Sequence, residues 1–281
     1  MGASWGLLMV TIEPRYEPIL RALGLNSFEA LSQFFLGDGD GAPASRTPPR
    51  TGVRVVPKLL QPEGHPPLAV FFKQYDHEPP SWRFLGRASK ARCEYVNYEV
   101  FRDLRVAAAE RMATGEERDV LGRLRRAFIL TVAVPESMTL VEFAKRYGSR
   151  AEQVGATALR RGLARQLGRM ARRLHAAGFY CHDLVWRNIL ATWQPPEAPK
   201  LWLIDCPRGG YDRHSPWRRR RLLKDLASLD KSGVRYASLA ERVAFLQAYL
   251  GTPRLGPEGR RLAKDVCTYR RDKWPEDWEG R

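Results

Sequence analysis

The chain has 281 residues, 44% of them hydrophobic, so it can bury the core of one large domain or of two lobes. No apolar run approaches the length that a bilayer-spanning helix requires. The formal net charge is +16 at pH 7, and nine of the 47 basic residues are lysine, which leaves 38 arginines. Such a surface attracts phosphates, anionic lipid head groups or nucleic acid, although arginines supplied by a biased genome can also be simply solvated.

The N-terminal residues and the cysteines lead us to expect a cytoplasmic protein. Residues 1–12 carry no basic leader, and Glu13 and Pro14 end their short apolar stretch, so no secretory signal is expected. The four cysteines show no paired spacing, which predicts reduced thiols rather than a disulfide framework or a zinc site. They are Cys93, Cys181, Cys206 and Cys267.

Hydrophobic periodicity and turn residues predict the elements in chain order. They are a helix over 13–36, a turn-rich loop over 37–52, strands at Val53–Leu60 and Leu68–Tyr75, a helix over 89–105, strands near 106–113 and 127–134, a long helix around 159–174, a short strand ending at Asp205, and helices over 217–230, 238–250 and 256–270. A strand-rich first half and a helix-rich second half predict an α+β fold of two lobes. We expect an N-terminal lobe over residues 1–134 and a C-terminal lobe over 135–281.

Three polar residues in the second half have a spacing suited to phosphoryl transfer. Asp183 lies five residues before Asn188, and Asp205 follows an apolar run. In this order protein-kinase-like enzymes place a base that accepts a hydroxyl proton, then an amide and a carboxylate that hold Mg²⁺ against ATP phosphates. The alternative is an ordinary polar loop, since Asp and Asn are common in turns.

A lysine in the first half fits the same chemistry. Lys73 ends the apolar run Leu68–Phe72, where an ammonium group can pair with ATP phosphates if a carboxylate holds it in place. Glu94 and Glu99 lie on the helix that follows, and we favour Glu94 because its helical neighbours form the inward face. Otherwise Lys73 is a surface lysine at a strand end.

Further signals are architectural or weak. Asp225 falls in the part of the second lobe where kinase-like folds use a buried acid to accept backbone N–H groups of the loop that carries the base, which is an architectural role. The arginines at 218–221 could bind an acidic substrate or lipid, or form a solvated helix start. The glycines within 37–52 lack the Lys and Ser or Thr of a P-loop, and no other glycine-rich phosphate loop is recognisable.

Together these residues resemble the lipopolysaccharide kinase family, which includes heptose and Kdo kinases of the bacterial envelope. The resemblance runs from about Leu25 to Ser232. Its segments are Leu25–Leu31, Phe71–Lys73, Ala91–Tyr95, Phe128–Thr131, Leu174–Gly178, Asp183–Asn188, Leu203–Asp205 and Leu223–Leu229. It implies a two-lobed protein-kinase-like fold that uses ATP and Mg²⁺ to phosphorylate a sugar hydroxyl of the lipopolysaccharide inner core.

The resemblance also implies roles and partners. Lys73 would bind ATP phosphates and Glu94 would orient it, Asp183 would be the base, and Asn188 and Asp205 would hold magnesium. The acceptor would be an anionic glycolipid, reached by peripheral contact with the inner face of the cytoplasmic membrane, and nucleic acid is not expected.

Two departures from the kinase pattern affect the loops. Cys181 stands where kinases usually have His, and it can fill that space without making the same hydrogen bonds. Cys206 and Pro207 follow Asp205, where Phe-Gly or a similar pair is common, and Pro207 stiffens a segment that often moves.

Two other functions are compatible with this pattern. One is a kinase for another small molecule or a protein, because the phosphoryl-transfer residues are shared across the fold. The other is a non-catalytic basic scaffold, a pseudokinase or a nucleic-acid binder. A pseudokinase usually lacks one of Lys73, Asp183 and Asp205, and this chain has all three.

Overall fold

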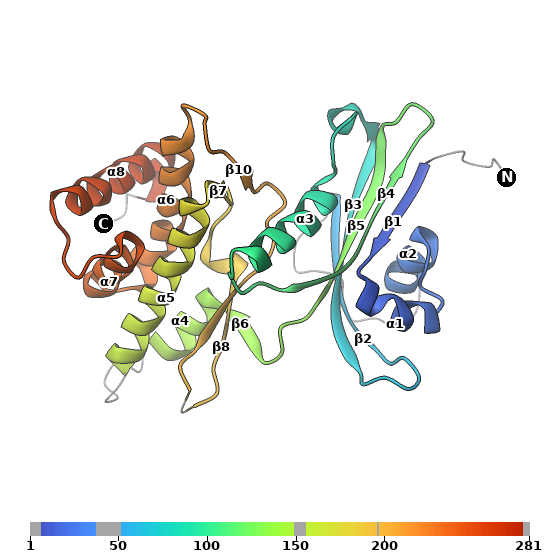
Figure 1. Ribbon diagram of the computed structural model, residues 1–281, viewed down its shortest axis with the longest axis horizontal. Coiled ribbons are helices and arrows are strands. Elements are labelled where there is room, and N and C mark those ends of the chain that lie inside the picture. Colours follow the sequence, from blue (N-terminus) through green and yellow to red (C-terminus); the bar gives the residue numbers. More distant parts are fainter. Residues whose placement is uncertain (1–6, 38–51, 149–155, 196, 278–281) are drawn as a thin grey trace. The chain divides into compact units, whose positions relative to one another are not determined.

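The computed structural model describes residues 7–37, 52–148, 156–195 and 197–277 (Figure 1). The chain divides into two compact units. The first holds the residues up to Glu99 together with Ala109–Ala133, and the second holds Val100–Ala108 and everything from Val134 onward. Almost all of the loop predicted over 37–52 lies outside the described residues.

The first unit is built around a five-stranded antiparallel sheet with strand order β1-β4-β5-β3-β2. The strands are β1 (Leu7–Ile12), β2 (Val53–Leu60), β3 (Leu68–Ser81), β4 (Glu110–Arg118) and β5 (Leu124–Val132). Lys73 lies on β3, opposite Val55 of β2 and Ile129 of β5. Because side chains alternate along a strand, Phe72 is buried on one face and Lys73 points to the other.

Helices cover both faces of this sheet, with α1 and α2 on one face and α3 on the other (Figure 1). The helical segments are η1 (Pro14–Tyr16), α1 (Glu17–Ala22), α2 (Phe28–Leu36), η2 (Trp82–Phe84) and α3 (Lys90–Asp103). Phe72 anchors the core beneath α2: its ring centroid lies 4.6 Å from that of Phe35 and 5.2 Å from that of Phe128. Gly115 on β4 leaves room for Phe128, because an added Cβ would come within 2.3 Å of that ring.

The prediction of one helix over 13–36 is wrong. The helix ends after α1, where Gly24 adopts a φ of 69°, and the chain turns before α2 begins. Ser27 then caps α2 by accepting a hydrogen bond from the Ala30 N–H at 3.1 Å.

The second unit is mainly helical, with two small sheets. Its helices are α4 (Leu140–Gly148), α5 (Ala156–Ala176), α6 (Arg218–Tyr236), α7 (Leu239–Leu250) and α8 (Pro257–Lys273), with short turns η3 (Trp186–Asn188) and η4 (Pro275–Asp277). Its strands are β6 (Ser137–Thr139), β7 (Phe179–Tyr180), β8 (Ile189–Thr192), β9 (Lys200–Leu203) and β10 (Gly210–Tyr211). Strands β6, β8 and β9 form one sheet, and β7 pairs with β10.

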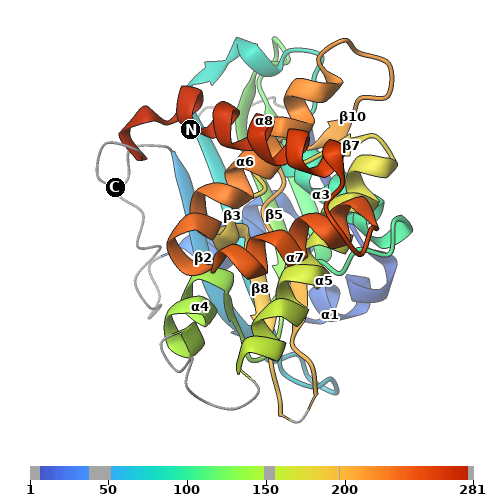
Figure 2. The same ribbon diagram turned by 90° about the vertical axis from the view of Figure 1, so that its left-hand side faces the viewer.

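Close helix packing holds this unit together, with α7 against α5 and α8 against α6 (Figure 2). Gly168 permits the crossing of α5 and α7, because an added Cβ would lie 2.3 Å from the backbone oxygen of Phe245. Ser238 and Glu241 form a capping box that fixes the start of α7. No helix within the described ranges is both long enough and apolar enough to cross a bilayer.

Candidate active site

Lys73 and Glu94 form an ion pair in the first unit. The Lys73 Nζ lies 3.1 Å from the Glu94 Oε2, and both side chains are largely buried. Tyr98 also donates a hydrogen bond to the Glu94 carboxylate, over 3.3 Å. Glu99, the other candidate, pairs with Arg111 at 3.1 Å. The structure therefore places Glu94 beside Lys73, as α3 periodicity predicts, and their role in nucleotide binding stays a prediction.

The loop that carries Asp183 is held in place by hydrogen bonds to the Asp183 carbonyl. The Asp183 carbonyl accepts hydrogen bonds from the Val185 N–H at 2.9 Å and from the Asn188 Nδ2 at 3.1 Å. Because the amide nitrogen of Asn188 is used in this way, its Oδ1 is the atom that can face a cation. Asn188 is thus held to the residue predicted to be the base.

Strand pairing brings Asp205 close to the same loop. The Asn188 carbonyl accepts a hydrogen bond from the Ile204 N–H at 3.0 Å, and Ile189 of β8 lies opposite Leu203 of β9. Asp205 follows directly, so the second unit gathers Asp183, Asn188 and Asp205 at one end of a strand pair.

Two residues of these loops have left-handed backbones. His182, next to Asp183, has a φ of 63°, and Asp205 has a φ of 56°. Such a conformation costs a residue with a side chain about 1–3 kcal/mol, and it concentrates where a structure must aim a functional group. Two of the four non-glycine residues with positive φ in the described part of the chain thus lie in the loops that the sequence singles out, and the other two are Arg105 and Glu136.

The donor set suits Mg²⁺ bound together with a nucleotide. Asn188 and Asp205 offer an amide oxygen and a carboxylate, which are ligands that Mg²⁺ prefers, and phosphates and water usually complete its octahedron. Within the described ranges no cluster of three or more His, Cys, Asp or Glu side chains could hold a metal by itself. The residues fit a cation whose remaining ligands come from ATP phosphates and water.

Asp225 supports the loop that carries Asp183 through a buried hydrogen bond. Its side chain is fully buried on α6, and it accepts a hydrogen bond from the Cys181 N–H at 2.8 Å. His175 lies 3.4 Å from the same carboxylate through Nε2 and 3.0 Å from the Tyr249 hydroxyl through Nδ1. The predicted architectural role of Asp225 is confirmed, and His175 is likewise a buried support.

The two loop cysteines are buried thiols. The Cys206 Sγ lies 3.9 Å from the Cys181 carbonyl oxygen, and none of the four cysteines, all within the described residues, forms a disulfide. Hydrogen bonding with Cys206 and burial raise the pKa of Cys181 well above its ordinary value. Both thiols fill space, and Cys181 stays protonated at neutral pH.

Burial lowers the pKa of His182, helped by the positive charges of Lys224 and Arg221 and opposed by nearby carboxylates. His182 is therefore neutral at pH 7.

Arg208 is a site residue that the sequence did not single out. Its Nη1 lies 3.7 Å from the Asp183 Oδ2, and its side chain is 58% exposed. The only available signal was a basic residue three positions after Asp205, in a stretch that otherwise indicates a turn. Arg208 therefore places a positive charge beside the Asp183 carboxylate.

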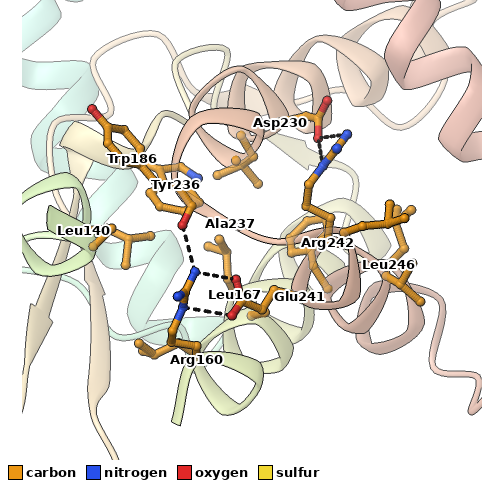
Figure 3. A pocket seen from close by; sticks show the side chains of 18 of the residues that line it. Leu140, Arg160, Leu167, Trp186, Asp230, Tyr236, Ala237, Glu241, Arg242 and Leu246 are labelled. Carbon is orange, nitrogen blue, oxygen red and sulfur yellow. Dashed lines mark hydrogen bonds and ion pairs between the residues drawn. The ribbon is translucent and has the colours of Figure 1, made fainter. Parts of the chain in front are cut away.

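A separate cavity of about 250 Å³ lies among α4–α8 of the second unit (Figure 3). Its lining is almost wholly apolar. At one side Arg160 donates hydrogen bonds to the Tyr236 carbonyl at 3.1 Å and to Glu241 at 2.9 Å, and at another Arg242 pairs with Asp230 at 2.8 Å. The cavity does not include Asp183, Asn188 or Asp205.

Comparison with one solved structure agrees with this architecture. A structure described as WaaP in complex with acyl carrier protein has a TM-score of 0.69 and 22% sequence identity, covering 96% of this chain and 100% of that chain. This similarity confirms the α+β, protein-kinase-like fold. A Toxoplasma gondii specific rhoptry antigen kinase domain has a TM-score of 0.43 and 12% identity, covering 85% of this chain and 90% of that chain.

Sequence comparison identifies the family. No curated protein matches the chain. The model of the lipopolysaccharide kinase (Kdo/WaaP) family matches residues 77–249, which is more than half of the chain. The matched range contains Glu94, Asp183, Asn188 and Asp205 and begins four residues after Lys73. The chain therefore belongs to the lipopolysaccharide kinase (Kdo/WaaP) family.

Proposed function

We propose that this lipopolysaccharide kinase transfers a phosphoryl group from ATP to a sugar hydroxyl of the inner core, on heptose or Kdo, with Asp183 as the base. The observation that carries the proposal is the joining of Asp183, Asn188 and the start of the Asp205 loop by two hydrogen bonds of 3.1 and 3.0 Å. Family membership supports the reaction class, and this geometry supports the choice of residues.

The nucleotide would be held by charge. The Lys73 ammonium would bind ATP phosphates, and the buried Glu94 keeps that ammonium in one orientation before the nucleotide arrives. Asn188 Oδ1 and the Asp205 carboxylate would hold Mg²⁺, which when bound neutralises charge on the phosphates.

Proton transfer would occur at Asp183. The acceptor hydroxyl oxygen forms the new bond to the terminal phosphorus, the bond from that phosphorus to the bridging oxygen breaks, and the hydroxyl proton passes to the Asp183 carboxylate. Arg208, 3.7 Å from Asp183, favours an acceptor that carries negative charge. An inner-core glycolipid is such an acceptor, and the net charge of +16 suits peripheral contact with the cytoplasmic face of the inner membrane.

An acyl carrier protein is a second proposed partner. The WaaP structure is described as a complex with acyl carrier protein, and the apolar cavity of this chain could take an acyl chain (Figure 3). A rise in melting temperature with acylated carrier protein, and none with the unacylated form, would support this partner.

The test of the proposed function is ATP turnover by the purified protein with Mg²⁺, with and without deacylated inner-core lipopolysaccharide. We expect acceptor-dependent turnover in the parent protein and none in Asp183→Ala, with the fold retained. ATP binding without transfer would indicate another acceptor or a pseudokinase, and the absence of ATP binding would exclude the kinase mechanism proposed here.

A further inference from the structure

In the segment from the end of β10 to the start of α6, the aromatic side chains are exposed and the acidic side chain is buried. Tyr211 and Trp217 are 49% and 58% exposed, whereas Asp212 between them is buried. Asp212 accepts a hydrogen bond from the Ser215 N–H at 3.1 Å and pairs with the Arg221 Nε at 2.9 Å. These contacts of the buried Asp212 carboxylate fix the loop, so the side chains of Tyr211 and Trp217 are held outward.

Positive charge surrounds these aromatic rings. Residues 210–221 contain five arginines and one aspartate. The Arg213 guanidinium lies 5.1 Å from the centre of the Tyr211 ring, and that of Arg220 lies 5.9 Å from the Trp217 ring. Within the described residues no carboxylate is found paired with either arginine, and Asp212, the one acid of this segment, pairs with Arg221.

The segment lies next to the proposed site. Gly210 and Tyr211 pair with Tyr180 and Phe179 of β7, directly before the loop of Asp183. Arg208, which contacts Asp183, is three residues from Tyr211, a stretch that spans at most about 11 Å. A surface bound through Tyr211 would therefore lie near the acceptor end of the site.

Aromatic rings flanked by arginines match the chemistry of a lipid head-group layer. Tyr and Trp favour the membrane–water interface, where the ring is partly desolvated and its polar edge stays wet. Arginines beside them are attracted by the negative surface of an anionic leaflet. A nucleic-acid duplex offers the charge but no layer for two outward-held rings to enter.

We infer that the surface from Tyr211 to Arg220 docks on an anionic lipid bilayer. Its use, the presentation of a membrane-borne glycolipid to Asp183, rests on the proposed function, whereas the binding itself requires no phosphoryl transfer.

The experiment is co-sedimentation with phosphatidylcholine vesicles, with and without phosphatidylglycerol. The test variant combines Trp217→Ala and Arg220→Glu. The matched control combines Trp82→Ala and Arg83→Glu in the first unit, where Trp82 is also 58% exposed and also has an arginine over its ring. All four side chains are exposed, and equal melting temperatures check that both variants are folded.

We expect the parent protein and the control to bind vesicles that contain phosphatidylglycerol and to bind neutral vesicles weakly. The test variant should lose at least about fivefold in partition coefficient, which is the factor equivalent to one arginine near an anionic surface. Equal binding by the test variant and the parent, equal losses in both variants, or parent binding that does not depend on phosphatidylglycerol would each overturn the inference.

Two further measurements separate this inference from the proposed function. Asp183→Ala should bind vesicles as the parent does while losing transfer, and the test variant should still phosphorylate deacylated acceptor. If no protein transfers phosphate but the vesicle results hold, the proposed function fails and the docking surface stands. If transfer is present and the vesicle results fail, only the docking surface is wrong.

Discussion

The position of the loop that carries Asp183 depends on a second carboxylate, that of Asp225. Asp225 accepts the Cys181 N–H at 2.8 Å from a fully buried position, two residues before Asp183. A buried N–H without an acceptor is costly, so this single contact fixes where the loop begins. The Asn188 amide then fixes where the loop ends.

Removing that carboxylate should loosen the loop. We expect Asp225→Ala to lower the free energy of unfolding by about 1–3 kcal/mol, the cost of leaving a buried donor unsatisfied. Turnover should fall more than stability accounts for, because the Asp183 loop loses its anchor. Urea unfolding and ATP turnover measure the two effects. Asp272→Ala is the control, since Asp272 pairs with its neighbour Arg271 on the surface and should change neither quantity.

Some residue contacts were accessible from the sequence and others were not. The choice of Glu94 over Glu99 followed from which side of α3 carries the inward-facing residues, and the ion pair is present. Arg208 was missed because its contact with Asp183 depends on the turn that follows Asp205, and no periodicity describes that turn. The left-handed backbones of His182 and Asp205 were also invisible, because neither residue type requires them.

At the element scale, α5 and α7 pack through a glycine rather than through a large side chain. Gly168 lies against the α7 backbone, whereas Gly162 of the same helix has open space beside it. Replacing each glycine by alanine therefore separates two effects within one helix: helix propensity at Gly162 and packing against α7 at Gly168.

We expect Gly168→Ala to destabilise the protein by about 1–3 kcal/mol, because an added methyl group would force the two helices apart. Gly162→Ala should stabilise it by up to about 1 kcal/mol, since alanine favours a helix interior. Melting temperatures that move in opposite directions would support this packing, and a gain from both substitutions would contradict it.

Glu116 on β4 connects the sheet to the start of α3, the helix that carries Glu94. It accepts a hydrogen bond from the Ser89 N–H at 2.7 Å, and Ser89 caps α3 by accepting one from the Arg92 N–H at 3.1 Å. Burial alone would raise the pKa of Glu116, but the hydrogen bonds from Ser89 and Arg118 together hold it below its ordinary value.

This carboxylate should make stability depend on pH. Because the pKa of Glu116 is lower in the folded state, its contribution is fully present above the ordinary carboxyl pKa of about 4.3 and is lost as pH falls through the lowered value. Glu116→Gln should cost about 1 kcal/mol at pH 7, the scale of a helix cap. Urea unfolding of parent and variant should show a constant difference above pH 5 that shrinks in acid; a difference that grows in acid would reverse the assignment.

Long elements with strong periodicity were predicted well, and short ones were not. Strand Val53–Leu60 has the predicted bounds, and helices 217–230, 238–250 and 256–270 correspond to α6, α7 and α8. The prediction of one helix over 13–36 was wrong because the tertiary packing of α1 and α2 as separate helices outweighed their shared amphipathic pattern. Strands β7 and β10 have two residues each, too few to show an alternation, and they exist only through their mutual pairing.

Over the whole molecule, the family match and the structural similarity agree with each other. The family match covers residues 77–249, and the similarity to the WaaP structure covers 96% of the chain. Neither comparison distinguishes heptose from Kdo as the acceptor. The strongly basic composition predicts an anionic partner, and the two proposals above assign such partners to Arg208 beside Asp183 and to the arginines around Trp217.

The most direct measurement is the mass of inner-core lipopolysaccharide after incubation with Mg²⁺-ATP and either the parent protein or Asp183→Asn. That substitution keeps the shape of the side chain and removes its ability to act as a base. We expect a gain of one phosphate with the parent protein and a loss of at least about a hundredfold in the rate with the variant. Transfer by Asp183→Asn at the parental rate would contradict the assignment of Asp183, and an unchanged acceptor mass with the parent protein would contradict the proposed reaction.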